Sequence, residues 1–152
     1  MAPEAANSFY NDMAYGAPWY TISTELLPAQ LQRIFKIPTG REMNFIAGLS
    51  MGGYGALRIG LAHPERYAAI GSFSGAVDLA SMLAAAKDVP PVRAMYAPVF
   101  GDELALPPEG DLFRLAKQAA PPPRPQQPPI PCTFGLQGQQ TAQVRATNHR
   151  CP

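Results

Sequence analysis

One short motif in this sequence has the residue types and the spacing of an activated nucleophile. Gly48-Leu49-Ser50-Met51-Gly52 fits the pattern G-x-S-x-G, in which a serine occupies a sharp turn between a strand and a helix. Glycines on both sides of that serine remove β-carbons that would collide in so tight a turn. The hydroxyl then stands clear of the sheet, where it can attack an acyl carbonyl. We therefore take Ser50 as the candidate nucleophile.

The residue after the serine supplies a second chemical group. The backbone amide of Met51 would lie at the positive end of the following helix, where it can donate a hydrogen bond to a developing oxyanion. Gly53 and Gly55 extend the run of glycines, so the first helical turn can pack close to neighbouring strands. Met51 is therefore the candidate oxyanion donor.

Closely spaced glycines also occur in phosphate-binding loops, and the spacing excludes two of them. A Walker loop needs Gly-Lys followed by Ser or Thr, whereas Gly52-Gly53 is followed by Tyr54. A dinucleotide fingerprint that began at Gly53 would need glycine at position 58, which is Arg58. The remaining alternative is an ordinary Gly/Ser turn that matches the motif by chance. We expect no cofactor and no metal ion.

The elements around the motif favour the nucleophile over a chance match. Residues 43–47 are short, mostly apolar and flanked by breakers, which predicts a buried strand. Residues 51–62 are predicted as a helix that ends at His63-Pro64, because the residue before proline leaves the helical region. Residues 67–73 are predicted as a second strand. Strand, helix and strand in this order form a βαβ unit of a parallel sheet.

The flanking segments are predicted from the same kinds of pattern. Residues 7–18 mix turn formers with aromatics and indicate a loop. Apolar residues recur at helical spacing from Trp19 to Phe35, with a fresh turn at Pro28, and residues 37–40 end that helix. Short helices are expected at 78–83 and 111–116. Four aromatic residues are expected to pack against the sheet edge or, in a complete enzyme, to line an acyl pocket: Tyr10, Tyr15, Trp19 and Tyr20.

Composition limits the classes of partner. The chain has 152 residues, 47% of them apolar, which is enough for one domain with a core. Its 12 Lys and Arg against 11 Asp and Glu give a formal charge of +1, without a basic cluster, so we expect no nucleic-acid partner. Neither a leader nor a membrane-spanning run is visible. We therefore expect a soluble, cytoplasmic protein that does not bind a membrane.

Three separated segments carry a resemblance to a known family. Residues 48–57, continued by 63–67 and 72–75, resemble the esterase D family, which includes S-formylglutathione hydrolases and tributyrin-type acetylesterases and is related to the mycolyltransferases. Residues 7–16 also resemble the tributyrin-type members, and the likeness continues at 100–102 and 111–113. The resemblance implies part of an α/β-hydrolase fold over residues 1–118, a parallel sheet with flanking helices, with Ser50 as nucleophile and the Met51 amide as one oxyanion donor.

Other parts of that family's active site do not map onto this sequence. The second oxyanion donor comes from a His-Gly loop, and this chain begins downstream of where that loop should be. The triad acid follows a later strand in a Gly-x-x-Asp context, and the base lies beyond it. There the sequence instead holds seven prolines between Pro121 and Pro131, so residues 119–152 are expected to be a disordered tail. We expect a chain truncated at both ends.

No other residue is expected to replace the missing acid and base. A helix from 51 to 62 places His63 roughly 18 Å from Ser50, so we interpret His63 as a helix-ending residue. His149, near the C-terminus, has no scaffold to hold it. Three acids are interpreted as helix-start or loop residues: Asp78, Asp102 and Asp111. Cys132 and Cys151 are interpreted as free thiols, because nothing completes a zinc site.

Three functions follow, from different classes. The first is a serine carboxylesterase-type hydrolase of short acyl esters or thioesters, with activity weakened by the missing base. The second is a non-catalytic fragment or interaction protein, left by a gene fragment, a frameshift near Ala119 or a wrongly assigned start. The third takes residues 122–125 as a polyproline ligand. The sequence indicates no oligomeric state.

Overall fold

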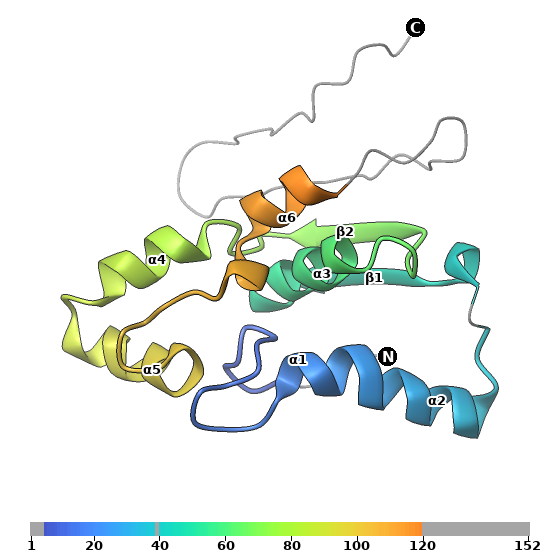
Figure 1. Cartoon of the computed structure of the whole chain (residues 1–152), viewed down its shortest axis with the longest axis horizontal. Coiled ribbons are helices and arrows are strands. Elements are labelled where there is room, and N and C mark those ends of the chain that lie inside the picture. The colour runs from blue at the N-terminus through green and yellow to red at the C-terminus, as the bar shows by residue number, and fades with distance from the viewer. Residues whose placement is uncertain (1–4, 39, 120–152) are drawn as a thin grey trace, which may run out of the picture.

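The computed structural model describes residues 5–38 and 40–119. A loop over residues 5–18 is followed by a helix-rich chain with strands in its middle (Figure 1). The elements in chain order are α1 (Trp19–Thr21), the π-helical η1 (Ile22–Leu26), α2 (Leu27–Phe35), the 3₁₀ turn η2 (Arg41–Met43), β1 (Phe45–Leu49), α3 (Met51–Ala62), β2 (Ala69–Phe73), α4 (Leu79–Ala86), α5 (Pro90–Phe100), the 3₁₀ turn η3 (Pro108–Gly110) and α6 (Leu112–Gln118).

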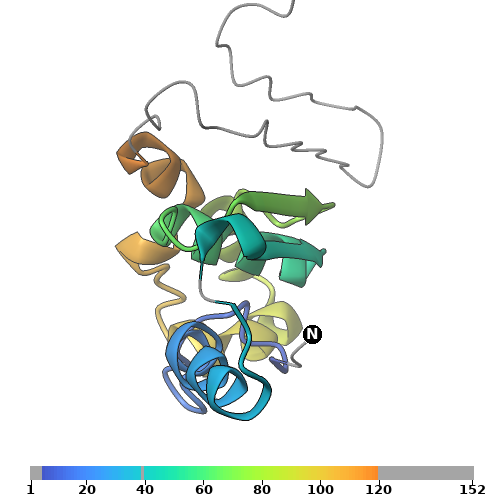
Figure 2. The same cartoon turned by 90° about the vertical axis from the view of Figure 1, so that its right-hand side faces the viewer.

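The predicted βαβ unit is confirmed. Strands β1 and β2 pair in parallel with Phe45 opposite Ala69 and Leu49 opposite Phe73, and α3 connects them. The helix has the predicted bounds and lies across one face of the strands (Figure 2). The fold class is therefore α/β, as predicted.

Strand β1 differs from its prediction in position and in burial. Met43 belongs to the turn η2, where its amide donates to the carbonyl of Gly40 at 3.0 Å, so the strand starts and ends two residues later than predicted. It runs directly into Ser50. The predicted burial is wrong, since Phe45 is 68% and Leu49 is 69% exposed. Their side chains lie on the face opposite α3, which no layer in the described part of the chain covers.

The outer edge of β1 is also open. The Asn44 carbonyl accepts from Ala68, and the Ser50 amide donates to Phe73, so these even-numbered positions direct their backbone groups toward β2. Backbone direction alternates along a strand. Phe45, Ala47 and Leu49 therefore direct their amides and carbonyls away from β2, and β2 is the strand paired with β1 in the described sheet.

The hydrophobic core lies on the α3 side of the sheet. Helix α3 is buried from Gly53 to Gly60, α6 packs against it, and α4 and α5 pack on each other to one side of it (Figure 1). Tyr54, Leu79 and Leu83 are at most 1% exposed. Within residues 5–38 and 40–119, no helix is both long and apolar enough to cross a membrane.

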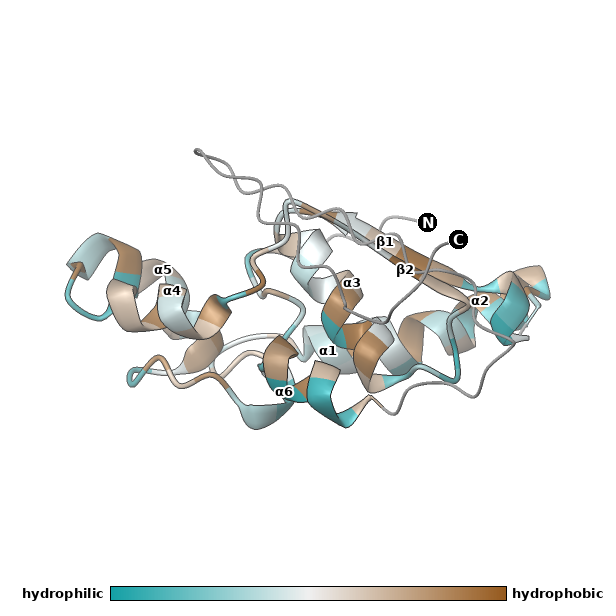
Figure 3. Ribbon diagram, turned by 90° about the horizontal axis from the view of Figure 1, so that it is seen from above, coloured by the Kyte–Doolittle hydropathy of each residue, from teal (hydrophilic) through white to brown (hydrophobic). Residues whose placement is uncertain are grey.

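Some of the helices around this unit agree with their predictions from the sequence, and others differ. Pro28 lies at the start of α2, as predicted, and Lys36 ends that helix in a left-handed conformation with φ of 49°. The apolar side chains near its end, Ile34 and Phe35, are exposed. Figure 3 shows that hydrophilic and hydrophobic residues alternate along the ribbon of α2. Helix α5 was not predicted, and it contains Pro98, although proline normally interrupts a helix.

Candidate active site

Ser50 lies at the junction of β1 and α3 in a strained backbone conformation. Its φ of 54° and ψ of −119° fall outside the regions that most residues adopt. The junction is held by the backbone, since the Ser50 amide donates to Phe73 at 2.8 Å and the Ser50 carbonyl accepts from Tyr54 at 3.1 Å. The residue is exposed, and its hydroxyl does not cap the helix. The side chain is therefore presented to solvent with its backbone fixed.

The two motif glycines contribute differently to this turn. A β-carbon on Gly48 would lie 2.2 Å from the carbonyl oxygen of Gly52, a collision that no rotamer could relieve. A β-carbon on Gly52 would meet only the Tyr10 hydroxyl, at 3.9 Å. The steric requirement predicted for both flanking glycines therefore holds for Gly48, while Gly52 has open space beside it.

The bare first turn of α3 approaches two different neighbours. At Gly53 a β-carbon would lie 2.8 Å from Ser72 Oγ of β2, which confirms the predicted close approach to a strand. At Gly55 it would lie 2.3 Å from the ring of Tyr10, so this glycine makes room for the N-terminal loop and not for a strand. Met51 is the first residue of α3, and its amide therefore has no acceptor within the helix.

The structure places His63 at the opposite end of α3. It is the C-cap of that helix, as predicted, and the twelve residues of α3 separate it from Ser50 by about 18 Å along the axis. Its Nε2 lies 3.0 Å from the Tyr20 hydroxyl and its Nδ1 lies 3.6 Å from Glu65 Oε1. His63 therefore ties α1 to the end of α3 and does not reach Ser50.

The acids have the structural positions expected from the sequence. Asp78 caps α4 by accepting from the Ser81 amide, and Asp111 caps α6 by accepting from two amides of its first turn. Asp102 lies in a loop, where it accepts a hydrogen bond from the Tyr15 hydroxyl at 3.3 Å. These carboxylates are thus engaged away from Ser50. Four features predicted from the sequence lie outside the described residues: His149, Cys132, Cys151 and the polyproline segment 122–125.

Arg58 is a buried cation that the sequence reasoning did not identify as important. It is 3% exposed, and its guanidinium donates to the carbonyls of Tyr10 and Glu109 and lies 4.1 Å from the ring centre of Tyr20. Burial lowers the pKa of the Arg58 guanidinium, and burial raises the pKa of the Tyr20 hydroxyl. A helical arginine among apolar residues was the available signal, because a buried charge needs partners.

The aromatic residues of the N-terminal segment pack mainly on α3. Tyr10 lies against Gly55, and Tyr20 stacks on His63 at the end of α3. Tyr54, from α3 itself, is fully buried and donates to the Gly110 carbonyl at 2.7 Å. Burial raises the pKa of Tyr54 to about 12. The loop, the helix and η3 are thereby joined into one unit.

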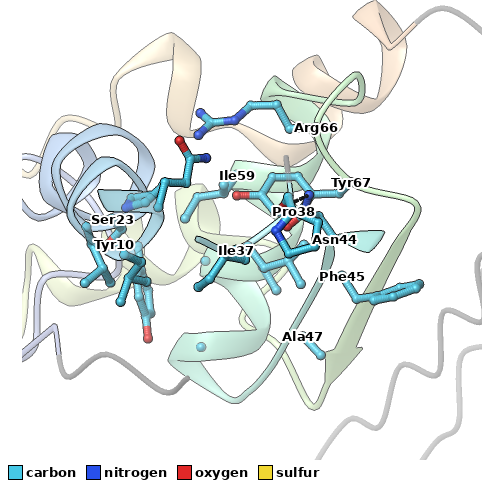
Figure 4. Close-up of a pocket in the computed structure, with 18 residues that line it drawn as sticks. Tyr10, Ser23, Ile37, Pro38, Asn44, Phe45, Ala47, Ile59, Arg66 and Tyr67 are labelled. Atoms are coloured by element: carbon cyan, nitrogen blue, oxygen red, sulfur yellow. Dashed lines mark hydrogen bonds between the residues drawn. The ribbon is translucent and has the colours of Figure 1, made fainter. Parts of the chain in front are cut away.

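A cavity of about 350 Å³ lies beside the first turn of α3 (Figure 4). Tyr10 and Gly52 line it close to the elbow, while α2 and the outer edge of β1 form its longer walls. Most of its lining is apolar, and Arg66 is the one lining residue with a full charge within the described ranges. The cavity adjoins the candidate nucleophile without including Ser50 among its lining residues.

The family to which this chain belongs follows from comparison with known proteins. The sequence model of the esterase family described as "Putative esterase" matches residues 4–146, so the chain is a member of that family. An acetyl esterase of Caldicellulosiruptor saccharolyticus is 36% identical over 105 residues, which are 66% of this chain and 39% of that protein. The matched range extends beyond residue 118, up to residue 146.

Solved serine hydrolases share the fold. FphF, a fluorophosphonate-binding serine hydrolase of Staphylococcus aureus solved with bound substrate, is 27% identical with a TM-score of 0.64 and matches 77% of this chain and 44% of its own. The S-formylglutathione hydrolase FrmB of the same organism is 26% identical with a TM-score of 0.58 over the same shares. MPT51 of Mycobacterium tuberculosis, at 19% identity, 74% and 55% coverage and a TM-score of 0.51, shows the fold alone.

These comparisons confirm the resemblance found in the sequence. The chain is a member of an esterase family and is similar to S-formylglutathione hydrolase-like serine hydrolases of the α/β-hydrolase type. It spans less than half the length of the acetyl esterase and of both staphylococcal hydrolases. The complete proteins' activities are therefore starting points for a proposal about this chain.

Proposed function

We propose that this chain is a serine carboxylesterase-type hydrolase that attacks short acyl esters or thioesters through Ser50. The exposed serine at a strained strand-to-helix junction is the observation that carries the proposal. Oγ of Ser50 forms a bond to the acyl carbon, the alcohol or thiol leaves with the proton of the serine hydroxyl, exchanged through solvent, and water later releases the acid. The amide of Met51 donates to the oxyanion, because it lies at the N-terminal end of α3.

The names of the similar proteins support this chemistry. One is an acetyl esterase, one a fluorophosphonate-binding serine hydrolase and one an S-formylglutathione hydrolase. All three match regions that include most of this chain's described residues. Acyl transfer to a serine is the step that an ester and a thioester substrate share, so the proposal extends to both substrate classes.

The proposed turnover is low. Within the described residues, Ser50 Oγ has no hydrogen-bond partner and His63 is held by Tyr20 and Glu65 at the far end of α3. A serine without its base loses about four or more orders of magnitude in rate. Formation of the acyl-enzyme is therefore expected to be slow but measurable, since the oxyanion donor and the exposed hydroxyl persist.

A fluorophosphonate tests the nucleophile directly. Oγ of Ser50 displaces fluoride from phosphorus and loses its proton to solvent, so intact-mass spectrometry should show one phosphonyl group per chain, mapped to Ser50. Ser50→Ala should abolish the adduct. Ser74→Ala is the matched control, because Ser74 is also exposed with a positive φ of 48° but does not precede a helix. A folded chain that stays unlabelled contradicts the proposal.

The position of His63 favours a second candidate, a non-catalytic esterase-fold protein that binds a partner. In that case the folded chain would not react with the fluorophosphonate, and Ser50→Ala would leave every property unchanged. Reaction with p-nitrophenyl acetate provides a second test that distinguishes the hydrolase from the non-catalytic protein. A burst of p-nitrophenol that disappears in Ser50→Ala supports the hydrolase, whereas equal release by both proteins supports the non-catalytic candidate.

A further inference from the structure

The N-terminal loop is strained where it meets α3. Phe9 and Tyr10 have φ values of 50° and 51°, in the left-handed region that is rare for bulky residues. Such conformations cost free energy and persist only where the surrounding structure imposes them. The placement of the Tyr10 ring is therefore enforced by its neighbours.

Buried polar side chains impose this conformation. The guanidinium of Arg58 donates to the Tyr10 carbonyl, and Ser8 Oγ accepts from the Tyr10 amide at 3.0 Å. Nδ2 of Asn11 donates to the Phe9 carbonyl at 2.9 Å. Arg58, Ser8 and Asn11 are each at most 3% exposed. Their desolvated polar groups would be costly to leave unpaired, so the loop is held in one position.

The Tyr10 ring packs against helix α3. The missing β-carbon of Gly55 lets the Tyr10 ring lie directly on the helix backbone, since a methyl group there would stand 2.3 Å from it. The Tyr10 hydroxyl is directed toward the first turn of α3, 3.9 Å from the β-carbon position of Gly52 (Figure 4). The ring thus occupies the space beside the turn that follows Ser50.

The cavity behind this ring has the chemistry of an alkyl site. Leu27, Leu31 and Ile59 are among its lining side chains, and none of its lining residues is a carboxylate. An alkyl chain that contacts these side chains gains free energy from burial, while the polar lining residues, which include Gln32 and Arg66, border the same cavity. Tyr10 and Gly52 both line the cavity, so the Tyr10 ring borders it next to the turn that follows Ser50.

We propose that Tyr10 is a specificity-determining residue that restricts the esterase site to short acyl groups. The proposal rests on Ser50 being the nucleophile. An acyl chain that extends from Ser50 past Gly52 meets the phenol ring before it can enter the cavity. When the ring is removed, the cavity accepts the alkyl part of a longer acyl ester.

Alkyl phosphonofluoridates test acyl length without requiring turnover. The alkyl group on phosphorus takes the place of the acyl chain, and intact mass gives the labelling rates of methyl and octyl probes. The octyl-to-methyl rate ratio should rise about tenfold or more in Tyr10→Ala, the range expected when an apolar pocket is opened to added methylenes. Tyr10→Phe keeps the ring and should keep the ratio.

A control variant and a second variant that shortens the Tyr10 side chain test whether the effect is specific to Tyr10. Tyr15→Ala removes an aromatic ring of the same loop that is 64% exposed and bonds Asp102, and it should leave the ratio unchanged. Tyr10→Leu retains an apolar contact with Gly55 while shortening the side chain, so it serves where Tyr10→Ala does not fold. Labelling of Ser50 with an unchanged ratio in folded Tyr10→Ala or Tyr10→Leu overturns the inference and leaves the proposed function intact.

A binding measurement separates this inference from the proposed function. In the Ser50→Ala background, sodium octanoate should raise the melting temperature of the Tyr10→Ala variant and leave that of the Tyr10-containing protein unchanged. If no variant reacts at Ser50, the proposed function fails, and octanoate binding alone decides whether the cavity is an alkyl site. Absence of binding by the doubly substituted protein overturns the inference.

Discussion

The two faces of the small sheet differ in what covers them. On one face, Ile70 is 7% exposed and packs with α3 in the core. On the other, Phe73, only three residues further along the same strand, is 54% exposed. Ile70 and Phe73 thus differ in burial within one strand, although their strand propensities and hydrophobicities are similar. The difference shows that, in the described part of the chain, this strand buries its apolar side chain on the side of α3.

The largest effect is expected from shortening a side chain on the covered face. Ile70→Ala should lower the free energy of unfolding by about 2–5 kcal/mol, because it removes buried methylenes and leaves a cavity. Urea denaturation followed by circular dichroism measures the loss. A change below about 1 kcal/mol would mean that α3 does not pack firmly on β2, and the contrast between the two faces would disappear.

The pH dependence of stability tests the core on the α3 side, where Tyr54 is buried. Its folded pKa of about 12 lies above the ordinary value of 10.0, so above pH 10 the unfolded chain loses this proton before the folded chain does. Stability is fully present below pH 10 and is lost as the pH rises toward 12, by about 2–3 kcal/mol in total.

Ultraviolet absorbance of phenolate follows this titration, and Tyr54→Phe supplies the control. The variant should lose the latest-titrating phenolate and should show a shallower decline of stability between pH 10 and 12. An identical decline in the variant would assign the dependence to other tyrosines, since burial also raises the pKa of Tyr20, Tyr67 and Tyr96.

A pair of glycine substitutions on α3 tests how closely the covered side is packed. Gly55→Ala places a methyl group 2.3 Å from the Tyr10 ring and should cost about 1–3 kcal/mol through overpacking. Gly52→Ala meets no atom closer than 3.9 Å and should stabilise the helix by about 0.5–1 kcal/mol. Thermal melts rank the two variants, and the reverse order would show that the loop does not lie on Gly55.

The smallest effect is expected on the open face. Leu49→Thr replaces a side chain that is 69% exposed with a β-branched residue that suits a strand, so stability should change by no more than about 0.5 kcal/mol. The same urea titration checks it. A loss as large as that of Ile70→Ala would show that this face is covered in solution.

Local patterns predicted the elements that position the site, and tertiary packing determined the rest. The helix bounds at Met51 and Ala62 followed from glycines before it and His63-Pro64 after it. The start of β1 did not follow, because the turn at Arg41–Met43 depends on a hydrogen bond that composition does not encode.

The candidate site was predictable where chemistry depends on neighbours in sequence. Ser50 and Met51 were identified by the motif around them. The contacts of Tyr10 with Gly55 and Arg58 join residues more than forty positions apart, and a single sequence gives no signal for such pairs. Helix α5 was not predicted either, and the proline inside it is an unfavourable local signal for a helix.

The open edge of β1 has a practical consequence for work with this protein. Within the described ranges, Phe45, Ala47 and Leu49 have no strand partner for their backbone donors and acceptors on that side, which lies next to exposed apolar side chains. Neither proline nor a charged residue interrupts the strand. Such an edge is a template for strands of other molecules. We therefore expect the protein to form oligomers and precipitate as its concentration is raised. The substitution Ala47→Lys should reduce this association, because it places a charge at the edge of the strand.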